Sequence, residues 1–171
     1  MEGLVAPGAV VRAGVVEMFA AHRVGLVRLA VLLVDDQATA EDIVQDAFAG
    51  LLRRLADGAV IDQGQAYLRT AVVNNARSAL RRRRSARWFA PWHEPAEPGS
   101  EDALILADEH VEILRLVRRL PRRQREVLVL RYWSGLTEAE IASTLGISPG
   151  TVKSTASRAV ATLKRHLEAG G

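Results

Sequence analysis

The stretch TEAEIASTLGISPGTVKS, residues 137–154, contains two helix-start signals close together. In the first signal, Thr137 is followed three residues later by Glu140, which is the pattern of a capping box. Leu136 and Ile141 are spaced as a hydrophobic staple around it. A helix is therefore predicted to begin at Glu138.

The second signal follows a glycine. Gly146 permits a tight exit from the first helix, because a residue without Cβ adopts backbone conformations that other residues avoid. Ser148 can cap the next helix, and Pro149 suits its first position, where no N–H is needed. Two helices joined by so short a turn form a helix-turn-helix, a motif whose second helix lies in the DNA major groove.

The second helix of this motif has an apolar and a polar side. Its inward side is predicted to hold Val152, Ala156, Ala159 and Leu163, and its outer side and flanks Lys153, Ser154, Ser157, Arg158, Lys164 and Arg165. The outer side combines hydroxyls with cations and begins at a helix N-terminus, which favours phosphates. DNA binding is the leading interpretation. An ordinary αα-hairpin is the alternative, since capping boxes occur in every kind of helical protein.

Apolar residues elsewhere recur at spacings of three and four, as in amphipathic helices. The predicted helices cover residues 15–33, 43–55, 65–84, 106–117 and the segment after Pro121. No strand pattern appears, so the fold class is predicted to be all-α.

A proline-rich segment divides the chain. WFAPWHEPAEPGSED, residues 88–102, has three prolines and a glycine, which prevent a long helix. We therefore predict two small helical domains, residues 13–86 and 103–168, joined by a linker at 87–102, with the helix-turn-helix in the second. We expect the domains to be loosely tethered, and Trp88, Phe89 and Trp92 to lie on extended backbone, either packed on a domain or buried by a partner.

Charge is arranged in blocks of one sign. Residues 35–50 contain five acids and no Lys or Arg, whereas residues 69–87 contain seven arginines and no acid. Residues 141–167 contain four Lys or Arg and again no acid. Solvated faces are one explanation, and separate surfaces for separate partners are the other. The acidic helix would repel DNA, so its polar face is expected to meet solvent or a basic protein.

Other classes of function find little support. The chain has no cysteine and four histidines without metal-ligand spacing, so we expect no metal, cofactor, small-molecule substrate or enzymatic activity. The carboxylates at 41, 42 and 46 lack the loop or histidines of a cation site. The longest apolar run, Val24–Val34, is too short to span a membrane and contains Arg28, so a cytoplasmic location is expected.

Three motifs together resemble a known family. They are AEDIVQDAF (40–48), AYLRTAVVNNARSALRRRR (66–84) and LPRRQREVLVLRYWSGLTEAEIASTLGISPGTVKS (120–154). In this order they resemble the extracytoplasmic function (ECF) group of the sigma-70 family of bacterial RNA polymerase sigma factors. The resemblance implies that the first domain corresponds to sigma region 2 and the second to region 4.

The resemblance also implies partners and sites. Core RNA polymerase would be bound through its β′ clamp coiled coil and its β flap, and the polymerase-binding residues would be Asp42, Gln45, Asp46 and Phe48. The minus-10 promoter element would be bound by Thr70, Asn74, Arg77 and Arg81, with Asn74 at the position that reads a flipped base. The minus-35 element would be bound by Lys153, Ser154, Ser157 and Arg158. An anti-sigma factor is a further implied partner.

A stand-alone helix-turn-helix regulator remains the alternative function. Such a protein would need no acidic helix and would usually dimerise to bind two half-sites, but no dimerisation helix is evident. The chain also departs from the family at two places. Thr155 and Ala156 replace an Arg and a large aliphatic, which is expected to weaken phosphate contacts or shift minus-35 preference, and Asp35 and Asp36 replace Gly-Asp.

Overall fold

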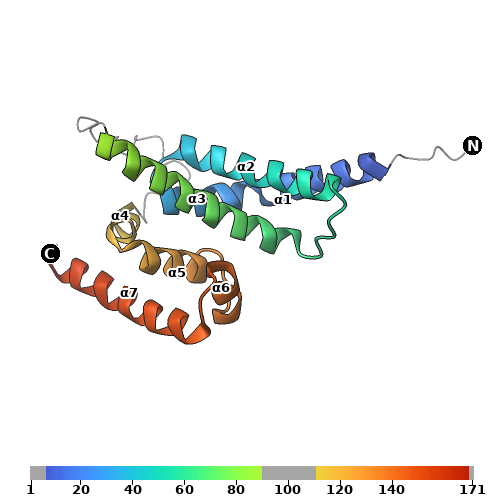
Figure 1. Cartoon of the computed structure of the whole chain (residues 1–171). Coiled ribbons are helices and arrows are strands. Elements are labelled where there is room, and N and C mark those ends of the chain that lie inside the picture. Colours follow the sequence, from blue (N-terminus) through green and yellow to red (C-terminus); the bar gives the residue numbers. More distant parts are fainter. Residues whose placement is uncertain (1–6, 90–110, 170–171) are drawn as a thin grey trace, which may run out of the picture.

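The computed structural model describes residues 7–89 and 111–169, and over these ranges the chain is α-helical without strands (Figure 1). The helices are α1 (Pro7–Val34), α2 (Gln37–Ala56), α3 (Gly64–Phe89), α4 (Val111–Arg119), α5 (Arg122–Tyr132), α6 (Glu138–Leu145) and α7 (Pro149–Ala169). The predicted all-α class is confirmed. None of the described helices is both long and apolar enough to cross a membrane.

The helices α1, α2 and α3 pack side by side as an N-terminal group (Figure 1). The turn between α1 and α2 is two residues long. Asp35 adopts a left-handed backbone conformation with φ of 72°, and Asp36 caps α2 by accepting a hydrogen bond from the Thr39 N–H at 2.8 Å. Across the group, the Asn75 side chain donates to the Ile43 carbonyl at 3.3 Å, which ties α3 to α2.

The helices α4 to α7 form a C-terminal group that contains the predicted helix-turn-helix. The capping box at Thr137 and Glu140 is present in full at the start of α6. Gly146 ends α6 in the left-handed conformation with φ of 65°. The Thr151 N–H donates to the Ser148 hydroxyl at 3.1 Å, so Ser148 caps α7 as predicted.

The helix α3 is longer than predicted and continues through Phe89. Trp88 and Phe89 are therefore helical, and the prediction of extended backbone at these two residues is wrong. The physical reason is that a proline restricts mainly the residue directly before it, and the first proline of the segment is Pro91. Trp92 and the remainder of the predicted linker lie outside the described residues.

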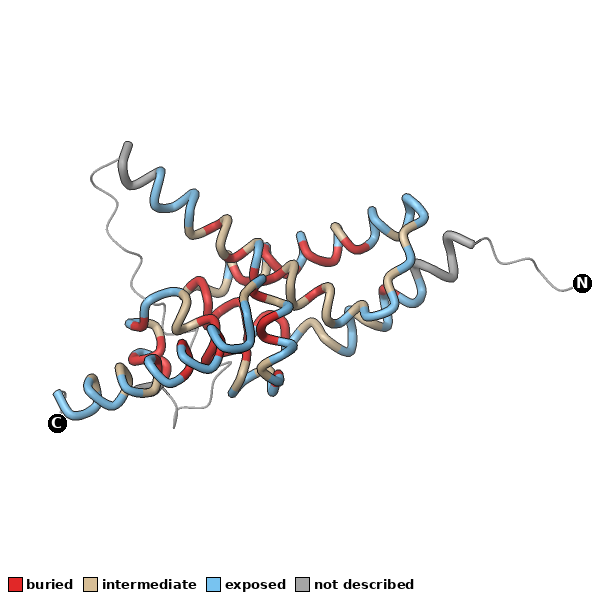
Figure 2. The backbone as a smooth tube through the Cα atoms, turned by 60° about the horizontal axis from the view of Figure 1, so that its bottom comes forward, coloured by how far each residue is buried: buried red, intermediate tan, exposed pale blue. Residues whose placement is uncertain are grey.

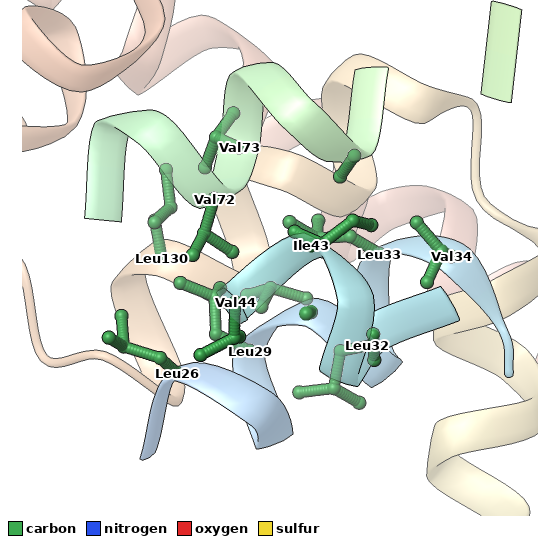
Figure 3. Close-up of a cluster of buried hydrophobic side chains, with 14 of the residues drawn as sticks. Leu26, Leu29, Leu32, Leu33, Val34, Ile43, Val44, Val72, Val73 and Leu130 are labelled. Carbon is green, nitrogen blue, oxygen red and sulfur yellow. The ribbon is translucent and has the colours of Figure 1, made fainter. Parts of the chain in front are cut away.

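The two helical groups share one hydrophobic core, so the prediction of loosely tethered domains is wrong for this structure. The helix α5 explains the continuity. Its residues 127–130 are all buried, and because consecutive helical residues point about 100° apart, this central part of α5 is covered on every side, whereas Arg122 and Tyr132 at its ends are exposed. Buried segments gather in the middle of the molecule (Figure 2). One side of α5 packs on α6 and α7. The other packs on α1, and Leu130 lies in the core with Leu26, Leu29, Val44 and Val72 (Figure 3).

Candidate nucleic-acid and protein interfaces

The helix α2 presents an acidic face to solvent. Asp42, Gln45 and Asp46 are exposed on successive positions of one side, and the opposite side is buried in the core. Glu41 beside them accepts a hydrogen bond from Gln37 at 3.0 Å and lies 3.9 Å from Arg23. Within the described ranges no ion pair involves Asp42 or Asp46. Their charges are therefore available to a basic partner.

Phe48 differs from the other residues predicted to bind polymerase. Its side chain is buried, with 4% of the residue exposed, and its ring meets that of Phe19 edge-on at 4.9 Å between centroids. The reason lies in its position on α2, because Phe48 follows Val44 by one turn and falls on the apolar stripe. Phe48 supports the acidic face from below and does not itself lie on the surface.

The basic side of α3 is only partly open. Asn74 and Arg81 are exposed and Thr70 is half-buried. Arg77 is placed differently. Its side chain is 19% exposed and forms two hydrogen bonds with Glu126 of α5, from Nε to Oε1 at 2.7 Å and from Nη2 to Oε2 at 2.8 Å.

The bond with Glu126 raises the pKa of the Arg77 guanidinium above its usual value, because it favours the charged form. In this structure the predicted contact of Arg77 with DNA is replaced by a contact within the protein. Sequence reasoning gave Glu126 no role. The available signal was a single acid among the arginines of RRQRE, directly before an apolar run.

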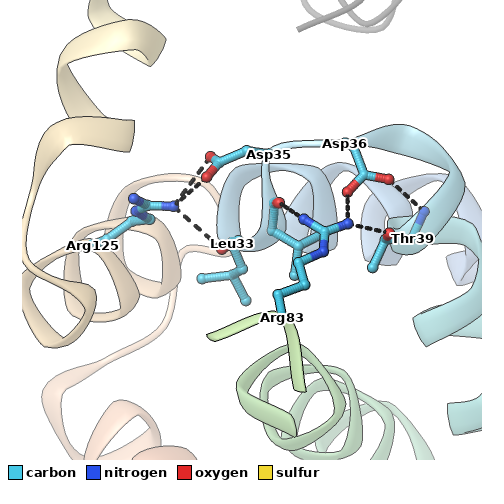
Figure 4. A network of polar contacts seen from close by, with 7 residues as sticks. Leu33, Asp35, Asp36, Thr39, Arg83 and Arg125 are labelled. Carbon is cyan, nitrogen blue, oxygen red and sulfur yellow. Dashed lines mark hydrogen bonds and ion pairs between the residues drawn. The ribbon is translucent and has the colours of Figure 1, made fainter. Parts of the chain in front are cut away.

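The arginines at the end of the row have separate environments. Arg82 and Arg84 are exposed. Arg83 is held by the α1–α2 turn, where it donates to the Val34 carbonyl at 3.2 Å, to the Asp36 carboxylate and to the Thr39 hydroxyl at 2.6 Å (Figure 4). Burial alone would raise the pKa of Asp36, but the hydrogen bonds from Arg83 and Thr39 outweigh it and hold that pKa below 3.8. Arg83 is therefore part of the fold of the N-terminal group.

The outer side of α7 is exposed along its length. Lys153, Ser154, Ser157 and Arg158 are all exposed, on one stripe of the helix. Arg158 folds back along the helix, donating to the Ser154 carbonyl at 3.2 Å and to its hydroxyl at 3.3 Å. The four side chains thus form one polar, acid-free surface that begins near the capped N-terminus of α7.

Thr155 and Ala156 are buried beneath this surface. Their departure from the family pattern therefore changes the packing under α7. The expectation that it weakens phosphate contacts or shifts minus-35 preference stays a prediction, and a buried Thr155 supplies no phosphate contact in place of the family's Arg.

Comparison with known proteins agrees with this arrangement. Residues 18–86 match sigma-70 region 2, and residues 110–163 match sigma-70 region 4. The RNA polymerase sigma-E factor of Streptomyces coelicolor is 34% identical over 147 residues, which cover 84% of this chain and 80% of that protein. The chain belongs to the sigma-70 family, in its ECF group.

Other relatives of this sigma factor carry the same group name or the same fold. The probable ECF RNA polymerase sigma factor SigI of Mycobacterium tuberculosis is 34% identical over 146 residues, which cover 81% of this chain and 50% of that protein. The sigma factor RpoE from Bartonella quintana, solved with the anti-sigma factor NepR, superimposes with a TM-score of 0.70 at 26% identity, over 89% of this chain and 95% of that one. CnrH, solved with the cytosolic domain of CnrY, gives 0.68 at 26% identity over 96% of both chains.

Proposed function

We propose that this sigma factor binds core RNA polymerase through α2 and promoter DNA through α3 and α7, and so directs transcription initiation. The separation of charge between exposed faces is the observation that supports this most directly. Asp42 and Asp46 lie open on α2, whereas residues 149–167 of α7 contain no acid and expose Lys153 and Arg158. A carboxylate face repels DNA and attracts a basic protein surface, so the two faces suit different partners.

In this proposal Asp42, Gln45 and Asp46 meet the β′ clamp coiled coil, and the C-terminal group meets the β flap. Thr70, Asn74 and Arg81 bind the minus-10 element, with Arg77 joining them once it leaves Glu126. The row Lys153, Ser154, Ser157 and Arg158 binds the minus-35 element. The division into domains at 13–86 and 103–168 belongs to the same proposal, with a linker at 87–102 whose first three residues continue α3.

The proposed role is that of an initiation factor without catalytic residues of its own. It acts in the cytoplasm, where the chromosome and polymerase are found. Because RpoE is solved with an anti-sigma factor and superimposes over most of this chain, we include an anti-sigma factor among the proposed partners.

Transcription from genomic fragments with purified core polymerase tests the function. We expect transcripts only when the chain is added, and we expect the double variant D42A/D46A to lose core binding at least tenfold. E17A, which removes an exposed acid of α1, serves as the matched control and should bind core as the parent does. Tight, sequence-specific promoter binding by the free chain without any association with core would instead identify a stand-alone regulator.

Variants of the two DNA-facing rows test the promoter contacts. R158A and K153A should weaken use of the minus-35 element by about 1–3 kcal/mol for each contact that reaches a base edge. N74A should impair promoter opening, because it removes the amide proposed to hold a flipped base. R119A, on the exposed side of α4, is the control for charge alone. A uniform loss of affinity across unrelated sequences would show phosphate contacts only.

A further inference from the structure

Glu126 is a buried carboxylate whose main partner comes from the other helical group. Its side chain is 3% exposed, and Arg77 of α3 binds both of its oxygens. Arg123 and Arg122 of its own helix approach it at 3.4 and 3.8 Å. A carboxylate out of water requires such partners, and removing one from a buried pair is strongly destabilising. Because Arg77 and Glu126 belong to different helical groups, this ion pair forms only when the two groups are packed against each other, an arrangement called closed below.

Asp35 joins the same two groups at another point. Its carboxylate oxygens lie 3.1 and 3.2 Å from Arg125 Nη1 (Figure 4). Its Oδ1 also lies 3.5 Å from Arg118 Nε, and both arginines belong to the C-terminal group. Arg125 also donates to the Leu33 carbonyl at 3.3 Å and to the Arg118 carbonyl.

Asp35 has a backbone conformation that is unusual for a residue with a side chain. With φ of 72° this residue occupies a conformation that favours glycine, and the family resemblance places a glycine here. A side chain at this position strains the turn, yet its carboxylate reaches two arginines of the C-terminal group. Asp35 is therefore less favourable than glycine for the backbone of the α1–α2 turn, but its carboxylate contributes to the contact between the two groups.

We propose that Asp35 and Glu126 hold the free sigma factor closed, and that Glu126 occupies Arg77 in place of a DNA phosphate. These two sets of ion pairs are called the closing contacts below. Carboxylates and phosphates bind the same paired N–H donors of a guanidinium, so Arg77 cannot serve both at once. Binding of DNA along α3 must then break the contact with Glu126, and the closing contacts lower the affinity of the free chain for DNA. Only the competition with DNA rests on the proposed function of α3; the closure does not.

The absence of cysteine from the chain gives a direct measurement of closure. Cysteines introduced at Ala38 of α2 and Ala161 of α7, both exposed, accept spin labels, and pulsed electron resonance then reports the distance between the groups. The variants are D35N, which keeps a residue tolerant of the left-handed conformation, and E126Q, which keeps the shape of the side chain. E138Q is the matched control. It removes the same charge as the other two variants, but Glu138 pairs with Arg131 at 3.2 Å inside the C-terminal group.

We expect a single narrow distance distribution in the parent and in E138Q, and a broader one with longer distances in D35N and E126Q. Binding of a short fluorescein-labelled DNA duplex should tighten roughly three- to tenfold in D35N and E126Q beyond any change in E138Q. Circular dichroism checks that the helices are retained. Should E126Q fail to fold, D35N decides, because Asp35 is partly exposed and lies outside the core.

Unchanged distances in both D35N and E126Q would overturn the proposal, whatever the DNA affinity. Broader distances with unchanged DNA affinity would overturn the competition between Glu126 and phosphate and leave the closure standing. A failure of the proposed function appears separately, as absent core-dependent transcription in a chain whose distances still respond to D35N.

Discussion

At the scale of single residues, Asp36 has two tasks in the α1–α2 turn. It caps α2 through the Thr39 N–H and pairs with Arg83. D36A should lower the free energy of unfolding by about 1 kcal/mol at pH 7, the usual cost of losing an N-cap. D57A is the control, because Asp57 lies at the exposed C-terminal end of α2, where a negative charge opposes the helix dipole.

The effect of Asp36 should depend on pH in a defined direction. Its pKa in the folded chain is held below the ordinary value of 3.8. A carboxyl group whose pKa is lower in the folded chain than in the unfolded chain stabilises the fold at pH values above 3.8. This contribution is lost as the pH falls through the pKa of the folded chain. The difference in urea-unfolding free energy between the parent and D36A should therefore shrink below pH 4. A difference that grows on acidification would contradict the assigned charge state.

At the scale of elements, the turn between α6 and α7 depends on Gly146. Its φ of 65° is unfavourable for any residue with a Cβ, so G146A should destabilise the protein by about 1 kcal/mol. G150A offers a contrast on the adjacent helix. Gly150 is helical, and a Cβ there would meet no atom closer than 3.9 Å, so alanine should be neutral or stabilising by up to about 1 kcal/mol. Equal effects of both variants in thermal unfolding would show that the turn tolerates other backbone conformations.

At the scale of the whole molecule, the shared core should make the two helical groups unfold together. Leu130 of α5 is fully buried among residues of the N-terminal group. L130A should cost about 2–5 kcal/mol and separate unfolding into two transitions, because it leaves a cavity where the groups meet. L51A, a fully buried change in α2, should cost a similar amount and keep one transition. Two transitions in the parent chain would contradict a continuous core.

The order of helices and their exposed faces follow from the sequence because these features are local. Capping boxes, glycine turns and apolar spacings of three and four act within one or two helical turns, so α6, Gly146 and α7 are predicted closely. The exposed acidic face of α2 and the exposed outer side of α7 follow for the same reason, since a helix with one apolar stripe must turn its other side to solvent.

Contacts between distant parts of the chain were decided only by the tertiary structure. Arg77 and Glu126 are 49 residues apart and Asp35 and Arg125 are 90 apart, and charge patterns along the sequence do not say which opposite charges will meet. The four consecutive apolar residues 127–130 of α5 indicate burial on every side but do not identify the neighbouring helices. Periodicity determines which side of a helix is apolar, whereas the packing of whole helices determines what covers it. For that reason the sequence predicts the surfaces of this sigma factor, and the tertiary structure alone shows that Arg77 is already occupied.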